Sequence, residues 1–286
     1  MNVLLSLPKH NNNYMTTLIR TEWLKMKKYN AFWWIMGITA LSYPGINFIF
    51  NLGYKNIIEK PAQAVQYAKM AIGDPFSFPT VWHTTAYFSS WFVFIPAVVV
   101  IMFISNEYTF RTHRQNIIDG WSRKQFVTSK LIDVAIVSLL ITLLYATVSL
   151  VMGMTNQTRL IQDTWSQAYY IGLFALQTFA QLSIAFLIGF LVKKAFLALG
   201  IFIFYFLILE NLIIGLLKWK GSSAGDYLPL EISDKLIPPP GFFRIVDPES
   251  YDKSLEAIKP HIVLTVIVTA IIWFICYRVN SKRDLK

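Results

Sequence analysis

The sequence is poor in cysteine and in charge. A single cysteine, Cys276, excludes an intrachain disulfide and any metal cluster built on several thiolates. Charged residues make up only 15% of the 286 residues and hydrophobic residues 55%. Soluble domains contain about 25% charged residues. The composition therefore indicates a membrane protein with little room for a soluble domain.

Motifs for nucleotide binding and for a catalytic zinc site are also missing. The phosphate-binding pattern G-x-x-x-x-G-K-[ST] does not occur, nor does the zinc-binding pattern H-E-x-x-H. The four histidines are scattered along the chain, at His10, His83, His113 and His261. We therefore predict that the chain is not an enzyme and holds no cofactor or metal of its own.

Long apolar runs fill most of the chain. A transmembrane helix requires ~20 mostly apolar residues, and isolated strands would leave backbone groups unsatisfied in lipid. Six segments meet this requirement: 31–52, 86–105, 131–154, 169–192, 195–217 and 261–279. The predicted fold class is all-α, a polytopic membrane protein with six transmembrane helices. Pro44 and Pro96 are expected to kink their helices.

Two lysines separate the fourth and fifth of these segments. A continuous helix from Tyr169 to Leu217 would be about 73 Å long at 1.5 Å per residue, whereas a bilayer core is about 30 Å thick. The chain must therefore turn back at Lys193 and Lys194, and the two positive charges place that turn in the cytoplasm.

The basic residues are unevenly distributed between the connecting segments. With both termini in the cytoplasm, the cytoplasmic pieces hold 16 of the 26 Lys and Arg but only 5 of the 16 Asp and Glu. This asymmetry follows the positive-inside rule and predicts that orientation. It also accounts for the net charge of +10 without a nucleic-acid partner.

Residues 1–30 are predicted to be a cytoplasmic leader followed by an amphipathic helix. The stretch MNVLLSLPKH is a poor signal peptide, because it lacks a basic start and a cleavage site, and Met15 is an alternative start. From Tyr14 to Asn30, apolar residues at helical spacing occupy one face. Such a helix lies on the inner leaflet with its lysines near anionic lipid. A role beyond anchoring stays open.

The most polar stretch between two spans is 106–130, NEYTFRTHRQNIIDGWSRKQFVTSK. It is longer than a simple connector requires. The pattern predicts a short helix from Glu107 to Ile118 and a turn at Asp119–Gly120. A new helix capped by Ser122 is expected to run through Lys130 into the third span.

This stretch resembles the type 2 (ABC-2-like) permeases of ATP-binding-cassette (ABC) transporters. After their second span these carry a Glu, a Gly-Thr, a Pro-x-Ser-Arg and a Lys. The corresponding residues here are Glu107, Arg111-Thr112, Gly120-Trp121-Ser122-Arg123 and Lys130. Arg111 stands in place of the Gly and Gly120 in place of the Pro. The amphipathic helix, the six spans and the long segment before the last span fit the same layout.

The resemblance implies a permease subunit of a bacterial inner (plasma) membrane, working as a homodimer or heterodimer with a pair of cytosolic ABC ATPase subunits. ATP and Mg²⁺ would bind to the ATPase. Export is the expected direction, and the substrate is not specified. The segment 106–130 would dock on the ATPase, through Glu107, Arg111, Thr112, Arg114, Ser122, Arg123 and Lys130. The alternative is that its basic residues only hold the loop at anionic headgroups.

Glu210 places a carboxylate within the fifth span. A charge facing lipid at the centre of a bilayer costs at least ~2.5–3.5 kcal/mol, so this side chain is expected to face protein or water. One interpretation is a pathway or gate residue, as in a proton-coupled secondary transporter. The other is a structural hydrogen bond, in a permease or in a non-catalytic membrane scaffold. Gln177 and Gln181, one helical turn apart, are suited to a contact with a neighbouring helix.

The segment 218–260 is predicted to be extracytoplasmic. Pro238, Pro239 and Pro240 rule out a regular helix at that point. The resemblance implies re-entrant helices in this segment, whereas composition alone also fits an external loop resting on the membrane.

Overall fold

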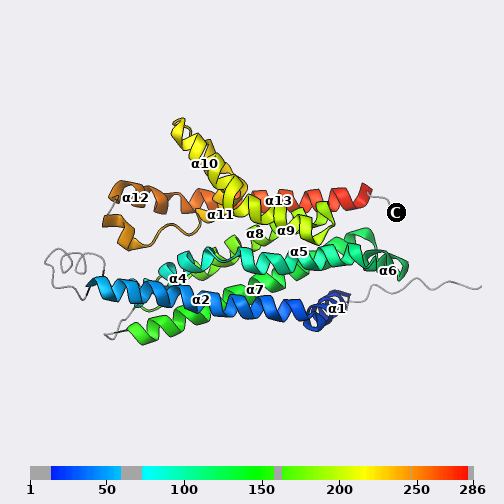
Figure 1. Cartoon of the computed structure of the whole chain (residues 1–286), viewed down its shortest axis with the longest axis horizontal. Helices are drawn as coiled ribbons and strands as arrows, with labels where there is room; N and C mark the ends of the chain where they lie inside the picture. Colours follow the sequence, from blue (N-terminus) through cyan, green and yellow to red (C-terminus); the bar gives the residue numbers. More distant parts are fainter. Residues whose placement is uncertain (1–13, 59–72, 158–162, 246, 283–286) are drawn as a thin grey trace, which may run out of the picture.

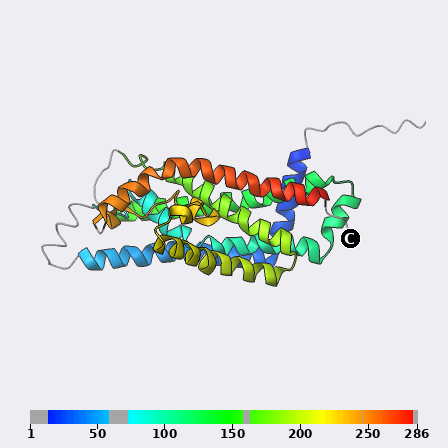
Figure 2. The same ribbon diagram turned by 90° about the horizontal axis from the view of Figure 1, so that it is seen from above.

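The computed structural model describes residues 14–58, 73–157, 163–245 and 247–282. Every regular element in these ranges is a helix, which confirms the all-helical fold class. The leader, residues 1–13, lies outside the described residues. The long helices lie side by side along one axis (Figures 1 and 2). They are α2 (Asn30–Ile58), α5 (Phe94–Thr109), α7 (Arg123–Asn156), α8 (Tyr169–Val192), α9 (Ala195–Phe204) and α13 (Ile258–Lys282). Helix α10 (Glu210–Trp219) leaves this direction and projects from the bundle (Figure 1).

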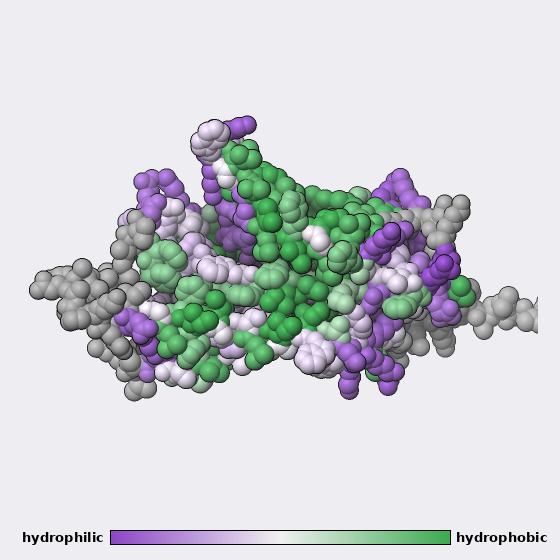
Figure 3. All heavy atoms as spheres, viewed as in Figure 1, coloured by the Kyte–Doolittle hydropathy of each residue, from purple (hydrophilic) through white to green (hydrophobic). Residues whose placement is uncertain are grey.

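Shorter helices mark the two ends of the bundle. At one end lie α1 (Tyr14–Lys28) and α6 (Thr112–Ile118), beside the C-terminal end of α13 (Figure 1). At the other end lies α12 (Pro248–Glu256). Hydrophilic side chains gather at both ends and hydrophobic ones over the middle (Figure 3). A soluble protein rarely exposes so continuous an apolar surface, whereas a bilayer would cover it.

Five helical segments in the described part of the chain are long and apolar enough to cross a membrane, or six if one bent pair counts as a span. The bent pair is α4 (Val81–Ser90) with α5, joined at an angle of 51°. The second span expected over 86–105 therefore begins earlier, breaks at 91–93 and ends at Thr109. Pro96 accounts for the break, because its missing N–H is tolerated only in the first turn of a helix. Pro44, by contrast, lies inside a single helix.

Other helix ends follow from local chemistry. Ser122 caps α7: its hydroxyl accepts the N–H of Gln125, whose side chain accepts the N–H of Ser122. This capping box confirms the predicted start of the third helix. Lys193 adopts a left-handed conformation with φ of 62° and ends α8, as the predicted reversal requires. A π-helical turn at Tyr205–Leu209 joins α9 to α10.

The segment between α10 and α13 folds back into the bundle. Helix α11 (Pro229–Asp234) packs against α8 and α13, between two 3₁₀ turns at Ser223–Tyr227 and Gly241–Ile245. The three prolines at 238–240 are non-helical, as predicted. Part of the 218–260 segment is therefore a helix packed against the bundle. Its extracytoplasmic position stays a prediction.

Helix α8 lies at the centre of the bundle and packs most closely on α5. At Gly189, an added Cβ would lie 2.7 Å from Ile104 Cγ2 and 3.4 Å from Ile101 Cα. The absence of a side chain at this position therefore sets how closely the two helices approach.

We predict that Gly189→Ala lowers the free energy of unfolding by about 1–3 kcal/mol, because the added methyl group overpacks the contact between α5 and α8. Denaturation of the purified chain in detergent measures this change. Gly172→Ala is the matched control on the same helix, since no atom lies within 4 Å of its added Cβ. Alanine there is expected to be neutral or stabilising by up to about 1 kcal/mol. Equal effects of the two substitutions would contradict the packing argument.

Candidate functional site

A network of buried charges joins three helices at the end of the bundle that carries α1 and α6. Lys130 Nζ, on α7, lies 2.7 Å from Glu22 Oε2, 2.9 Å from Glu107 Oε1 and 3.1 Å from Asp133 Oδ2. Lys25 Nζ, on α1, lies 3.1 Å from both Glu22 Oε1 and Glu107 Oε1. We call these five residues the ion network. Because its members come from α1, α5 and α7, it fixes the relative positions of these helices.

The central ammonium group is almost fully enclosed. Lys130 is 2% exposed, and its three N–H donors meet three carboxylates. Burial alone would raise the pKa of Glu22, but Lys130 and Lys25 lower it more, so the pKa of Glu22 lies below its ordinary value. Glu22 is therefore ionised at neutral pH. Buried ion pairs contribute little net stability, but losing one partner leaves uncompensated charge.

The coupling segment is attached directly to this network. Helix α5 continues through Glu107 to Thr109, and the chain turns at Arg111, whose φ of 55° is left-handed. The short helix expected from Glu107 therefore starts only at Thr112. The Thr112 hydroxyl donates to Glu107 Oε2 at 2.7 Å, and His113 Nδ1 lies 3.0 Å from the carbonyl oxygen of Glu107. Helix α6 is thus held against the end of α5 by a member of the ion network.

The start of α7 is also tied to the C-terminal end of α13. The Arg123 guanidinium donates to the carbonyl oxygen of Ser281 at 2.7 Å, and the Asn280 amide donates to the carbonyl oxygen of Arg123 at 2.8 Å. The Thr128 hydroxyl lies 2.8 Å from the Tyr277 hydroxyl. The arginine expected to contact a partner therefore holds two helices of this chain together.

The surface of α6 remains open. No residue of this helix is buried. Its last residue, Ile118, is 78% exposed, and Phe110, two residues before the helix begins, is 71% exposed. Arg111 is exposed beside Phe110, and Arg114 is half-buried. Exposed apolar residues on either side of Arg111 and Arg114, at the end of the bundle, form a surface suited to a protein partner.

Sequence similarity agrees with this layout. The sequence model of a family described as an ABC-2 family transporter protein matches residues 18–209. The chain belongs to the ABC-2 transporter family. No curated protein matches the chain. The family is a membrane transport component, so this chain is an integral membrane protein of the permease type.

The predicted coupling residues of this ABC-2 permease fall into two sets. Glu107 and Lys130 are buried in the ion network. The other predicted residues lie at the surface or are half-buried: Arg111, Thr112, Arg114, Ser122 and Arg123. Contact with an ATPase stays a prediction for all of them.

Three members of the ion network were missed from the sequence: Glu22, Lys25 and Asp133. A signal was present for Glu22, because it lies one helical turn from both Leu18 and Met26, which are buried. A carboxylate on the apolar face of an amphipathic helix needs a buried partner. The identity of that partner, 108 positions along the chain, depends on the fold.

Glu210 has a structural role at the other polar site of the permease. Its Oε1 accepts the N–H groups of Leu230 and Glu231, both at 2.8 Å, which caps the first turn of α11. Gln177 and Gln181 both donate to Asp234 Oδ1, at 2.8 and 2.7 Å. The expected contact of the two glutamines is thus confirmed, with Asp234 as their shared acceptor. A pathway or gate role for Glu210 stays a prediction.

The sequence contains one match to a hydrolase pattern. Gly221-Ser222-Ser223-Ala224-Gly225 fits G-x-S-x-G. The nucleophile in that motif sits on a sharp turn between a strand and a helix. Here the motif follows α10 and forms a turn and a 3₁₀ helix, where the Ser222 hydroxyl caps the N–H of Ala224. The match therefore lacks the structural context of a catalytic serine.

We predict that Lys130→Met lowers the free energy of unfolding by about 3–5 kcal/mol, because three carboxylates lose their shared counter-charge. Thermal unfolding in detergent measures the change. Lys124→Met is the matched control: this lysine lies six residues earlier on α7 and is exposed. Its replacement is expected to change stability by no more than about 0.5 kcal/mol. Similar effects at both positions would contradict the role of the ion network.

Proposed function

We propose that this chain is the membrane-spanning subunit of an ATP-driven ABC exporter and that α6 docks on a separate cytosolic ATPase. The observation that carries the proposal is the exposed surface formed by Phe110, Arg111 and Ile118. Ile118 is the last residue of α6, and the other two residues directly precede this helix. Helix α6 is tied, through Thr112 and Glu107, to the ion network. ATP and Mg²⁺ would be held by the ATPase.

Coupling through α6 requires that this helix be rigidly attached to the other helices of the bundle. A displacement of α6 by closing ATPase subunits would reach Glu107 through the Thr112 hydroxyl and then α1 and α7 through Lys130. Packed helices with two discrete arrangements convert such small shifts into larger motions. The contact chain is short, which favours movement of the three helices as one body.

A second permease subunit is the expected partner within the membrane. Helix α10 projects away from the other helices (Figure 1). It exposes Leu212, Leu216 and Trp219, so lipid or a second subunit must cover it. The expected location is a bacterial inner membrane with both termini in the cytoplasm. That orientation is supported by the basic residues on α1, α6 and the last turn of α13.

A proton-coupled carrier that uses Glu210 has less support. Glu210 Oε1 already accepts two backbone N–H groups of α11, so a structural task accounts for this carboxylate without a transported proton. The same hydrogen bonds serve equally well in a permease, where they hold α11 in place.

We predict that the double variant Phe110→Ser/Ile118→Ser loses the ATPase on purification in mild detergent, because two exposed apolar contacts of the docking surface are removed. The expected loss is about tenfold or more in the amount of ATPase per permease, measured by quantitative mass spectrometry.

Phe196→Ser is the control, since Phe196 is 92% exposed in the first turn of α9, outside the coupling segment. The control should retain a stoichiometric ATPase. If the wild-type chain purifies without an ATPase even after gentle crosslinking, the proposed function is wrong. If the double variant retains the ATPase like the control, α6 is only a membrane-surface helix.

A further inference from the structure

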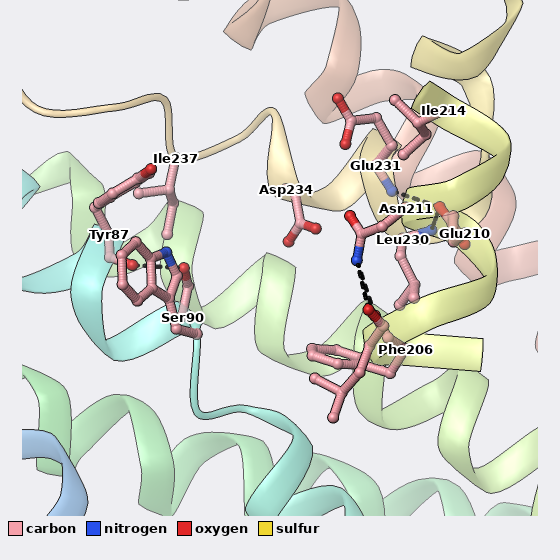
Figure 4. Close-up of a pocket in the computed structure, with 12 residues that line it drawn as sticks. Tyr87, Ser90, Phe206, Glu210, Asn211, Ile214, Leu230, Glu231, Asp234 and Ile237 are labelled. Carbon is pink, nitrogen blue, oxygen red and sulfur yellow. Dashed lines mark hydrogen bonds between the residues drawn. The ribbon is translucent and has the colours of Figure 1, made fainter. Parts of the chain in front are cut away.

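A cavity of about 360 Å³ lies between the break of the α4–α5 pair, α10 and α11. Figure 4 shows its lining residues around an open centre. Tyr87, Trp91 and Phe206 supply aromatic surface. The Tyr87 and Trp91 rings meet edge to face, with centroids 5.5 Å apart. Ligand sites in proteins are commonly cavities of about this size with largely aromatic walls.

The charged groups of this cavity all carry one sign. Glu210, Glu231 and Asp234 line it, and none of the 12 lining residues is basic. The Asp234 side chain projects into the open centre from the end of α11 (Figure 4), and it is exposed to that space. Its Oδ1 is held by two glutamine amides. The carboxylate is thus fixed in orientation by the bundle while remaining accessible from the cavity.

Glu210 provides a second, independent observation that the cavity favours a positive charge. It is only 2% exposed and lines the cavity. Its Oε1 caps α11, but its Oε2 accepts no hydrogen bond of ordinary geometry from a described residue, although Tyr205 lies beside it. A buried carboxylate oxygen without a donor is costly and would be stabilised by a positive charge in the cavity.

The residues that line the cavity favour one class of cation. Within the described residues no group of three or more His, Cys, Asp or Glu side chains could hold a metal ion, so a metal is not favoured. Aromatic faces beside a carboxylate suit an organic ammonium group, which gains from cation–π attraction and from apolar contact. A cation bound beside Asp234 would favour the ionised form of its carboxylate.

We propose that this cavity binds an organic ammonium group, with Asp234 as its counter-charge and Tyr87 and Trp91 as its aromatic wall. A role of this cavity in transport rests on the permease function proposed above. Binding of an ammonium group at the cavity does not depend on that function. The ammonium group belongs either to a free small molecule or to a lipid headgroup, and both share this chemistry.

Equilibrium dialysis of radiolabelled choline tests the proposal on the full chain in nanodiscs of anionic phosphatidylglycerol. Choline should bind saturably. The neutral isostere 3,3-dimethyl-1-butanol should compete at least about tenfold more weakly, because it lacks the charge. Asp234→Asn should weaken choline binding by about tenfold or more, and Trp91→Leu by roughly 2–30-fold.

Asp252→Asn is the charge-matched control. Asp252 lies on α12, away from the cavity lining, where it pairs with Arg244 at 3.3 Å. This variant should bind choline like the wild type. Thermal unfolding of each variant identifies loss of binding that results from misfolding, and Trp91→Leu tests the site without altering Asp234.

Nanodiscs that also contain phosphatidylcholine separate the two sources of ammonium. Weaker choline binding in these nanodiscs would assign the site to a lipid headgroup, and unchanged binding would assign it to a free molecule. The proposal is overturned if the wild type shows no saturable choline binding, if the neutral isostere competes equally, or if neither variant weakens binding. Because no ATPase is present in this assay, its failure leaves the proposed ATPase docking untouched.

Discussion

The arrangement of the whole bundle at its basic end depends on one buried ammonium group. Lys130 lies among three carboxylates from α1, α5 and α7, and it is hydrogen-bonded to each of them. Such a group is stable only while all its partners stay in place. The network therefore resists separation of the three helices, even though its net contribution to stability is small. Helix α6, which offers little buried surface of its own, is positioned by this network through Thr112.

At the other polar site a short helix is also held by polar side chains, through hydrogen bonds and not through a buried ammonium group. Helix α11 has only six residues, too few to be stable alone. Glu210 satisfies two of its N-terminal N–H groups, and two glutamines on α8 hold Asp234 at its C-terminal end. Polar side chains of long helices thus hold a short helix at each site. At the second site this leaves a carboxylate facing a cavity with aromatic walls.

Much of the fold was predictable because lipid imposes simple rules on a sequence. Hydropathy located the helices to within a few residues at most ends, and Lys193 marked a reversal that length alone required. Ser122 and Gln125 gave the start of α7 through local capping chemistry. The position of the break before α5 was predicted less accurately. Pro96 lacks the N–H for a helical hydrogen bond, but this does not determine the residue at which the preceding helix ends.

The candidate sites were less predictable, because their partners are far apart in the chain. Glu107 and Lys130 were singled out, but as groups for an external partner and not for each other. Asp234 meets Gln177 and Gln181 across more than 50 positions, and no local pattern specifies that pairing. Interactions within one turn can be read from a sequence, whereas pairings of this kind depend on how the helices pack.

We propose that α6 moves as one body with α1, α5 and α7 when an ATPase closes. The most direct test is a distance measurement by electron paramagnetic resonance, with spin labels at Lys28 on α1 and Gln115 on α6, both exposed. The permease–ATPase complex would be measured with and without ATP. We predict one narrow distance distribution, unchanged by ATP in the wild type and broadened in Lys130→Met. A distance between these labels that changes with ATP in the wild type would contradict it.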